Sequence, residues 1–355
     1  MTPQIGPVKA TARLKEKQNK VLVTQIAGFE EYNVCGNTSI LKARLADMKS
    51  NPEKYAGYRC GIRALDDATH GFRRGHLNVI VGKPGGFKTT LMLNIAYGLY
   101  HKGFNVLFFS LEMDAYELHM KKVSMTTGVP YQRLYCATYD DADIAKIDAF
   151  EAHEKTRKNE FRVVTQRQMG GVKTSDIERW LQDNSDAFKP DVILVDYLGL
   201  MTPESMDDSE RRDIGIGQIC KDFRVMGRAR GFSTITAAQF KTNSVQRIVQ
   251  KYPENPEKAC IDPSDIAESA MIGHTADAVF FLWPMPQNKV RLIASKVRHG
   301  VPNHAGIDLD VNPEIQYICD AHAGGYDVLP RSAPKPVMPV IEPAPAARYD
   351  GMDDI

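Results

Sequence analysis

The sequence has no long apolar run and no concentration of cysteine. No stretch of its 355 residues approaches the roughly 18 apolar residues that a membrane helix needs, and the N-terminus carries no hydrophobic signal core. The six cysteines are scattered without a C-x-x-C pair, so neither a disulfide framework nor a zinc site is indicated. We therefore expect a soluble, cytoplasmic protein.

Charge of either sign is not in excess. The formal net charge of +1 argues against a protein whose whole surface binds a polyanion, so any nucleic-acid contact must be local. The composition, 43% hydrophobic and 25% charged, suits one sizeable α/β domain with appendages. A basic start favours a solvated, disordered arm, with a transit peptide or a nucleic-acid-binding arm as alternatives; its cations are Lys9, Arg13, Lys15, Lys17 and Lys20.

Residues 79–96 predict a buried strand, a glycine-rich turn and the start of a helix. Such a turn directs backbone N–H groups and the positive end of a helix dipole at one point, as a phosphate chain requires. In the phosphate-loop pattern G-x-x-x-x-G-K-[ST], Lys88 would neutralise the β- and γ-phosphates and the Thr89 hydroxyl would hold Mg²⁺. The residues expected to bind nucleotide are Gly82, Pro84, Gly85, Gly86, Phe87, Lys88, Thr89 and Thr90.

Phe87 departs from that pattern, because it stands where the second glycine belongs. A bulky residue with a positive φ costs on the order of 1 kcal/mol or more. We therefore expect Gly85 and Gly86 to adopt the demanding dihedrals instead.

Apolar strands and helices alternate along most of the chain. Apolar strands separated by helices predict an α/β fold, in which a mostly parallel, twisted sheet carries helices on both faces. Ligands bind at the carboxyl ends of such strands. The predicted strands are 77–81, 105–110, 161–164, 191–196, 232–238, 278–283, 290–295 and 306–311, and the predicted helices include 116–125, 174–184 and 210–230.

Three polar residues end apolar runs and are therefore site candidates. Asp196 follows the run 192–195 and fits the Walker B role of holding Mg²⁺ together with Thr89. Glu112 ends the strand after the phosphate-loop helix, a position expected beside the loop, and suits a general base that activates the attacking water. Gln239 ends a later strand, where its amide would sense the γ-phosphate.

Several segments together resemble the RecA-like motor domain of DnaB-type replicative helicases. They are GKPGGFKTT (82–90), SLEM (110–113), DVILVDYLGLM (191–201), AAQF (237–240), DPSDIAESAMIGHTADAVFF (262–281) and SKVRHG (295–300). The resemblance spans roughly residues 61–311 and implies a RecA-like P-loop fold. It also implies a homohexameric ring that moves on single-stranded DNA, with ATP and Mg²⁺ bound between adjacent subunits. One subunit would supply Lys88, Thr89, Glu112, Asp196 and Gln239, and its neighbour would supply Lys296 and Arg298.

DNA contact in this family comes from loops that line the pore. The corresponding loop here is 241–247, with Lys241, Arg247 and the following Lys251 as the expected contacts. Polar and basic groups without aromatic residues suit gripping of phosphates, as a sequence-indifferent motor needs. Residues 202–213 are acidic for most of their length, so we interpret them as a subunit or surface loop.

We expect an N-terminal arm (1–36), a linker-helix region (37–60), the ATPase domain (61–327) and a Pro-rich tail (328–355). Leu41, Leu45 and Met48 share one stripe of a predicted helix over 38–49, which either packs on its own domain or docks on a neighbouring subunit. We expect the large N-terminal domain of the family to be missing, because only about 60 residues precede the segment that resembles the motor domain. The flexible or polyproline-like tail ends in an acidic-apolar tip that suits a groove on a primase, loader or single-strand-binding protein, unless it is simply solvated.

A DNA-unwinding motor is the leading hypothesis. A RecA- or RadA-like recombination or annealing ATPase shares the fold, but SLEM and the Lys-x-Arg pair at 296–298 argue against it. A ring subunit that binds nucleotide without hydrolysing it is the third alternative, raised by Phe87.

Overall fold

The computed structural model describes residues 24–26, 29–31, 38–166, 171–204, 212–251, 258, 261, 263–267 and 270–320. The chain divides into two compact units, residues 1–56 and 57–355. The second unit begins before the predicted boundary at residue 61, because Tyr58 and Phe72 are joined by two backbone hydrogen bonds of 2.9 Å. The Pro-rich tail, nearly all of the N-terminal arm and residues 205–211 of the acidic loop lie outside the described residues.

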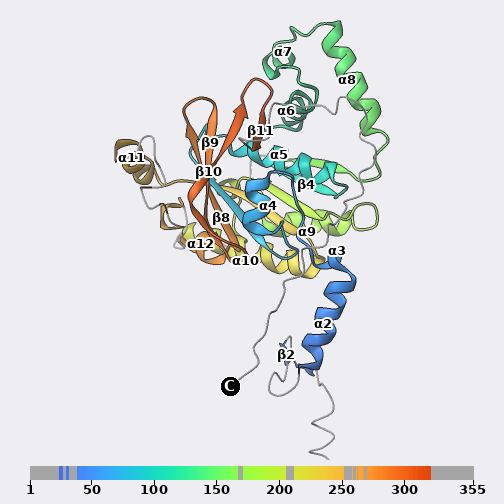
Figure 1. The fold of residues 1–355 in the computed structure, drawn as a ribbon, viewed down its shortest axis with the longest axis vertical. Coiled ribbons are helices and arrows are strands. Elements are labelled where there is room, and N and C mark those ends of the chain that lie inside the picture. Colours follow the sequence, from blue (N-terminus) through green and yellow to red (C-terminus); the bar gives the residue numbers. More distant parts are fainter. Residues whose placement is uncertain are drawn as a thin grey trace, which may run out of the picture. The chain divides into compact units, whose positions relative to one another are not determined.

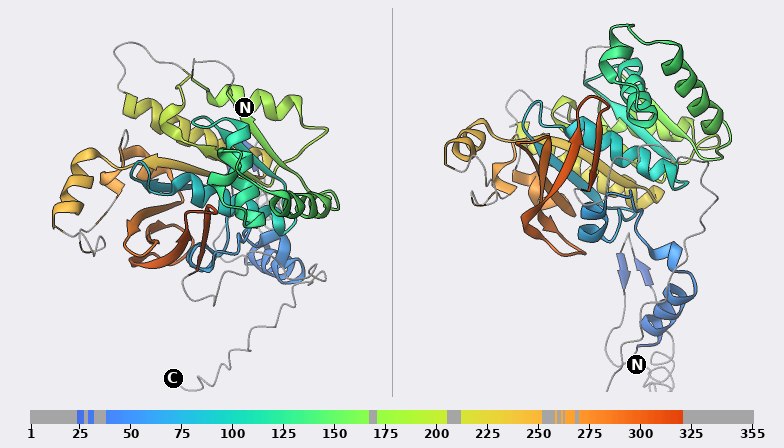
Figure 2. Two further views of the ribbon diagram at one scale, coloured as in Figure 1. Left: turned by 90° about the horizontal axis from the view of Figure 1, so that it is seen from above. Right: turned by 45° about the horizontal axis from the view of Figure 1, so that its top comes forward.

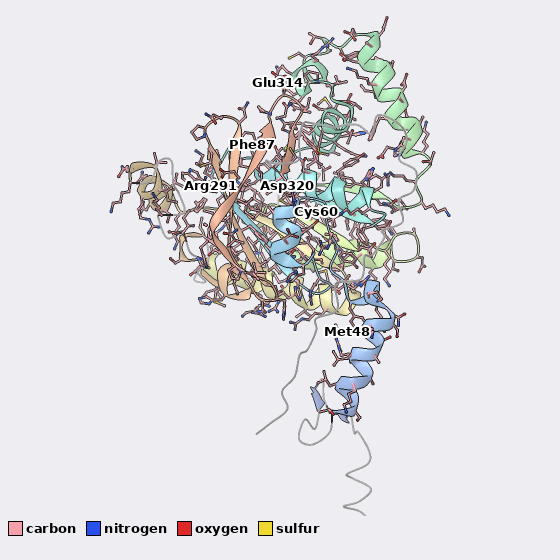
Figure 3. The ribbon with its side chains drawn as sticks, in the orientation of Figure 1. Met48, Cys60, Phe87, Arg291, Glu314 and Asp320 are labelled. Atoms are coloured by element: carbon pink, nitrogen blue, oxygen red, sulfur yellow. The ribbon has the colours of Figure 1, made fainter. Side chains whose placement is uncertain are left out.

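The first unit contains a small ribbon and two helices, β1 (Thr24–Ile26), β2 (Phe29–Glu31), α2 (Ser39–Ser50) and α3 (Pro52–Tyr55). The helix predicted over 38–49 is thus present as α2. It ends before Pro52, which starts α3 because proline is tolerated in the first turn of a helix. Leu41, Leu45 and Met48 are 55%, 52% and 40% exposed on α2 (Met48 is labelled in Figure 3).

A sheet forms the centre of the second unit (Figure 1). It has nine strands, in the order β11-β10-β9-β8-β3-β7-β6-β4-β5. The strands from β8 to β5 in this order are parallel, and β9, β10 and β11 extend the sheet in antiparallel pairs. The predicted mostly parallel sheet is confirmed. The strands are β3 (Leu77–Gly82), β4 (Val106–Ser110), β5 (Phe161–Thr165), β6 (Val192–Asp196), β7 (Ser233–Gln239), β8 (Ala278–Met285), β9 (Lys289–Val297), β10 (Asn303–Asn312) and β11 (Tyr317–Asp320).

Helices cover both faces of this sheet (Figure 2). One core lies under α4 (Arg63–Thr69), α5 (Lys88–His101) and α6 (Ala115–Thr127), and the other lies under α9 (Thr174–Asp183), α10 (Arg212–Arg230) and α12 (Ala270–Thr275).

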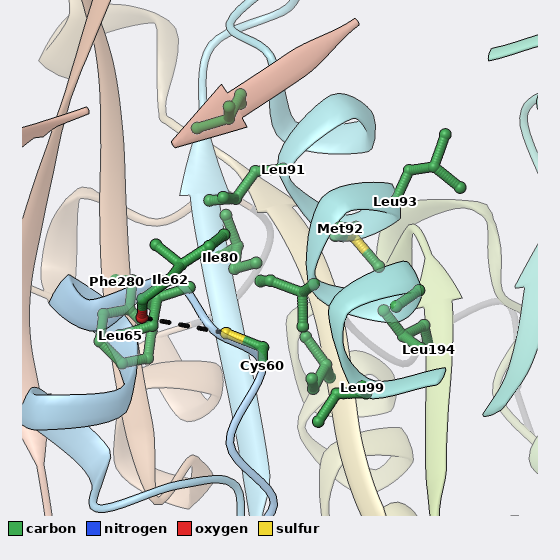
Figure 4. Packing of buried hydrophobic residues seen from close by; sticks show 14 of the residues in the cluster. Cys60, Ile62, Leu65, Ile80, Leu91, Met92, Leu93, Leu99, Leu194 and Phe280 are labelled. Carbon is green, nitrogen blue, oxygen red and sulfur yellow. Dashed lines mark hydrogen bonds between the residues drawn. The ribbon is translucent and has the colours of Figure 1, made fainter. Parts of the chain in front are cut away.

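Successive residues of β3 alternate between the two cores, as the pleat of a strand requires. Ile80 belongs to the first core, and Val79 and Val81 belong to the second. Figure 4 shows Ile80 in the first core with Leu65 of α4 and Leu91 of α5. Full burial of each such side chain contributes about 1.5–3 kcal/mol, so β3 is anchored on both faces.

Two helices that the sequence pattern did not predict, α7 (Tyr131–Tyr135) and α8 (Asp141–Glu154), lie between α6 and β5 (Figure 1). Asp140 caps α8 by accepting a hydrogen bond from the Asp143 N–H at 3.0 Å. Lys122 of α6 donates to Glu154 at 2.9 Å and so ties α8 to the body of the unit. None of the described helices is both long and apolar enough to cross a bilayer.

Candidate nucleotide site

The predicted nucleotide-binding residues gather where the parallel strands end, which we call the carboxyl edge of the sheet. β3, β7, β6 and β4 lie side by side, and the register pairs Gln239 with Gly82 at the start of the phosphate loop. Asp196 is the last residue of β6, Glu112 follows β4, and α5 begins at Lys88 directly after the loop. One edge therefore carries a phosphate loop, a buried carboxylate, an exposed carboxylate and an amide.

Glu112 reaches this site by a different route from the one predicted. β4 is not the neighbour of β3, because β7 and β6 lie between them. Instead, β4 pairs with β6, and the Leu111 N–H donates to the Asp196 carbonyl at 2.9 Å. The predicted position beside the loop is thus wrong in strand order, yet the exposed Glu112 carboxylate still interacts electrostatically with Lys88 and Asp196.

Lys88 is buried at the start of α5. Its ammonium donates a hydrogen bond of 2.9 Å to the Lys83 carbonyl inside the loop. Burial lowers the pKa of Lys88, and the charges of Asp196 and Glu112 oppose that change. The side chain lies close over Gly82, because a Cβ at Gly82 would be 2.8 Å from the Lys88 Cγ. A larger residue in place of Gly82, the first glycine of the loop, would therefore collide with the Lys88 side chain.

Asp196 is the most buried acid of the site, with 1% of its surface exposed. Its Oδ2 accepts a hydrogen bond of 2.6 Å from the Thr89 hydroxyl, whereas its buried Oδ1 has no partner among the described residues. Burial raises the pKa of Asp196 to about 6; Thr89 and Lys88 lower it, and Glu112 raises it further.

An unpaired buried carboxylate oxygen is costly, by about 1–3 kcal/mol or more, unless a ligand satisfies it. Oxygen atoms are the ligands that Mg²⁺ prefers, and carboxylates are usual among them. The Asp196 Oδ1 and the adjacent Thr89 hydroxyl, the two residues for which the sequence predicts this role, are therefore chemically suited to a magnesium site.

Phe87, which is labelled in Figure 3, itself adopts the left-handed conformation. Its φ is 64° and its ψ is 19°. The prediction that Gly85 and Gly86 carry the turn is only half correct, because Gly85 has φ 67° but Gly86 has no positive φ. Gly86 is needed for space instead, since a Cβ there would lie 2.8 Å from the Lys83 carbonyl oxygen. The Phe87 ring packs against the first core, which offsets part of a left-handed cost of about 1–2 kcal/mol.

We expect a Phe87→Gly protein to be more stable than a Phe87→Ala protein by about 1 kcal/mol. Both substitutions remove the ring, but only alanine keeps a Cβ at the positive φ. Urea unfolding of the two proteins measures the difference. As a control, Glu151→Gly and Glu151→Ala in the exposed part of α8 should show the opposite order, because glycine is the poorer helix former. If the Phe87→Ala protein is as stable as the Phe87→Gly protein, the positive φ at residue 87 does not strain the backbone.

Lys296 and Arg298 lie at the opposite, amino edge of the sheet, where the parallel strands begin. Lys296 pairs with Val279 near the start of β8, and Asn78 near the start of β3 pairs with Ala278. At about 3.3 Å per residue, the six residues of β3 separate the two edges by roughly 16 Å. The cation pair, as we call Lys296 and Arg298, therefore lies away from the phosphate loop of its own subunit.

Each member of the cation pair has an intramolecular partner. Lys296 donates to the carbonyls of Gly273 and His274, at 2.8 and 3.0 Å. Arg298 lies 3.3 Å from the buried carboxylate of Asp277. Sequence reasoning did not single out Asp277; the only available signal was its place in the segment 262–281, which is similar to the family.

The segment predicted as a DNA-binding loop is instead largely helical, α11 (Thr242–Lys251). Ser244 and Ile248 lie one turn apart and are buried, so α11 has an inner face that a solvated loop would lack. The prediction of a loop over 241–247 is therefore wrong, although the basic residues remain where they were expected.

Two of the three expected DNA contacts are engaged within the chain. Arg247 donates hydrogen bonds of 2.9 and 3.0 Å to the Asp265 carboxylate, and Lys241 donates to the Ser264 carbonyl. Lys251, at the end of α11, is exposed.

Several known proteins are similar to this chain in sequence. The replicative DNA helicase DnaB of Buchnera aphidicola subsp. Acyrthosiphon pisum is 27% identical over 230 residues, which are 64% of this chain and 47% of the relative. DnaB of Geobacillus stearothermophilus is 26% identical over 253 residues, which are 69% of this chain and 52% of the relative. The chain thus spans about half the length of these curated relatives.

A solved DnaB-like replicative helicase, described together with its interactions with primase, has the same fold. It superposes with a TM-score of 0.67 at 20% identity, and the match covers 88% of this chain and 72% of the other. The sequence model of the DnaB-like helicase C terminal domain matches residues 57–314, which include the phosphate loop, Asp196 and the cation pair. The chain therefore belongs to the DnaB-like helicase C-terminal domain family.

Proposed function

We propose that this chain is the motor of an ATP-driven replicative DNA helicase, which translocates on single-stranded DNA as a homohexameric ring and unwinds duplex DNA. The observation that carries the proposal is the division of the site between the two edges of one sheet. The phosphate loop and carboxylates lie at the carboxyl edge, and Lys296 and Arg298 lie at the amino edge. Subunits that stack head to tail would bring these edges together, and such contacts form a ring when the rotation between subunits closes. Membership of the family supports the same assignment.

Within one subunit, each polar group of the carboxyl edge has a role in ATP hydrolysis. The loop N–H groups and Lys88 would bind the β- and γ-phosphates. Thr89 and Asp196 would hold Mg²⁺, which neutralises charge on the phosphates when it is bound. Glu112 is exposed and interacts electrostatically with Lys88, and it would accept a proton from the attacking water. Gln239, paired with the start of the loop, would contact the γ-phosphate.

The cation pair of the neighbouring subunit would complete the site. A guanidinium offers a planar fork that matches two phosphoryl oxygens, so Arg298 suits the charge that develops on the transferred group. Lys296 would add a second positive charge. Because neither cation lies near its own phosphate loop, hydrolysis would require assembly.

Two assays on the purified protein test this function. Steady-state ATP turnover should rise when single-stranded DNA is added, and a forked duplex should be separated only with hydrolysable ATP. Lys88→Ala serves as the control that lacks turnover. DNA-stimulated turnover without strand separation would contradict the helicase and favour an annealing or recombination ATPase. No turnover under any condition would favour a subunit that only binds nucleotide.

We expect Lys251→Ala to weaken binding to single-stranded DNA equally for different sequences. Loss of one phosphate contact should reduce the slope of log affinity against log salt by about 0.7 per bound subunit. Fluorescence anisotropy at several salt concentrations measures both quantities. Lys155→Ala, beside α8, is the matched control and should change neither. An unchanged salt slope for Lys251→Ala would remove α11 from the DNA interface.

The remaining parts of the proposal concern partners. The exposed stripe of Leu41, Leu45 and Met48 suits a linker helix that docks on a neighbouring subunit. The tail at 328–355, outside the described residues, is proposed to bind a primase, loader or single-strand-binding protein. The cytoplasm of a bacterial or phage-infected cell is the proposed location.

A further inference from the structure

Asp277 is a buried acid that joins the cation pair to the start of β3. Only 2% of its surface is exposed. Its backbone N–H donates to the Leu77 carbonyl at 2.8 Å, and its Oδ2 accepts from the Leu77 N–H at 3.0 Å. Its own carbonyl accepts a hydrogen bond of 2.8 Å from the Arg298 N–H. The backbone of Arg298 is therefore fixed to the first residue of the central strand.

The other oxygen of this carboxylate serves two arginines. The Asp277 Oδ1 lies 3.0 Å from a guanidinium nitrogen of Arg224 in α10 and 3.3 Å from one of Arg298. The Arg224 side chain is 17% exposed and the Arg298 side chain is 39% exposed. One negative charge thus faces two guanidinium groups, with Lys296 close enough to interact with both. The cluster carries excess positive charge, which an incoming anion would compensate.

The two residues after Arg298, His299 and Gly300, are also held in place by packing. The ring of His299 stacks on that of His76, with 5.0 Å between the ring centroids. Gly300 packs so closely that a Cβ would lie 1.9 Å from the Ala68 carbonyl oxygen. A fixed backbone on both sides of a partly exposed guanidinium leaves the side chain as the part that can change partner.

We propose that Asp277 is the positioning residue for Arg298, and that it shares its charge with Arg224 so that Arg298 can exchange the carboxylate for the γ-phosphate of a neighbouring subunit. This inference rests on the proposed function. Arg224 is closer to the shared oxygen and more buried, so it keeps Asp277 neutralised when Arg298 leaves. Without Arg224, departure of Arg298 would strand a buried charge, which is strongly unfavourable.

Asp277 could also affect ATP turnover without acting on Arg298, through the strand that it supports. Through Leu77, Asp277 also supports β3, whose far end carries the phosphate loop of the same subunit. An Asp277→Asn protein keeps an amide oxygen for the Leu77 N–H but loses the charge that holds Arg298. We expect its ATP turnover to fall about tenfold to a hundredfold, with ATP binding unchanged, because the catalytic cation is misplaced.

Mixed assemblies distinguish the two roles, because each interface takes one face from each subunit. Glu112→Gln damages the carboxyl-edge face, and Arg298→Ala damages the cation face. If Asp277 acts on Arg298, mixing Asp277→Asn with Glu112→Gln should restore turnover, whereas mixing it with Arg298→Ala should not. Subunit exchange is verified by energy transfer between labelled subunits, and thermal unfolding checks that each variant is folded.

The controls separate failure of the inference from failure of the proposed function. Glu112→Gln mixed with Arg298→Ala must recover turnover; if it does not, the shared site itself is refuted. If that control recovers, three results overturn the role of Asp277. They are recovery of Asp277→Asn with Arg298→Ala, recovery with neither partner, and undiminished turnover of Asp277→Asn alone.

Discussion

Arg298→Ala should lower the rate of ATP turnover about a thousandfold or more and leave the affinity for ATP within about threefold of the original. The reason is the position of Arg298 at the amino edge, roughly 16 Å of strand away from the phosphate loop of its own subunit. An interaction made mainly as the phosphoryl group is transferred changes kcat and not ground-state binding. Steady-state turnover and binding of a fluorescent ATP analogue measure the two effects separately.

Two further variants make this result specific. Arg298→Lys keeps the charge but loses the planar fork, so it should recover only part of the lost turnover. Arg230→Ala removes another partly exposed arginine that precedes a strand at the same edge, and turnover should stay within about threefold of the original. A proportional loss of ATP affinity in Arg298→Ala would show that Arg298 binds the ground state and is not a catalytic residue.

Asp196→Asn should raise the free energy of unfolding of the nucleotide-free protein by about 1–3 kcal/mol at pH 7. The pKa of Asp196 is raised from 3.8 to about 6 in the folded protein, mainly by burial. The folded state therefore binds the proton more tightly than the unfolded state. The stability due to that proton is fully present below pH 3.8 and is lost as the pH rises through about 6.

The pH profile of this variant is the sharper measurement. Asparagine does not titrate, so the difference in unfolding free energy between variant and original should be smallest near pH 4 and largest above about pH 6. Urea unfolding across this range gives the difference directly. A difference that stays flat from pH 4 to 7 would contradict the raised pKa. With Mg²⁺ and ATP the order should reverse, because only the original protein gains stability from the bound metal.

The parts of the site that the sequence predicted are those that depend on neighbours along the chain. Lys88 and Thr89 follow a strand and a glycine-rich turn, and Asp196 ends an apolar run; each pattern is complete within about ten residues. The position of Glu112 depends on strand order, which no local pattern contains. The pairing of Arg298 with Asp277 depends on the antiparallel pairing of β8 with β9, which brings the residue before β8 next to the residue after β9, and it appeared only in the structure.

Two local predictions failed because tertiary packing decided the conformation. The buried face of α11 includes Ser244, whose hydroxyl donates a hydrogen bond of 2.7 Å to the buried Asp265. Because this buried position is polar, the sequence lacks the continuous apolar stripe by which an amphipathic helix is recognised. The sequence pattern predicts that Gly85 and Gly86, and not Phe87, adopt the demanding backbone dihedrals. Packing of its ring against the first core supports the left-handed conformation instead.

β3 ends at a phosphate loop and begins beside a cation pair, so in the proposed function every subunit would carry half of a site at each edge of its sheet. In the proposed head-to-tail arrangement, an open row of n subunits has n − 1 complete sites, and only closure of the row supplies the last one. A lone subunit would have no complete site. Dilution should therefore abolish ATP turnover at concentrations at which the protein is still folded. A closed ring has one complete site per subunit whatever its size, so closure, and not the number of subunits in the ring, would set how much ATP each chain can hydrolyse.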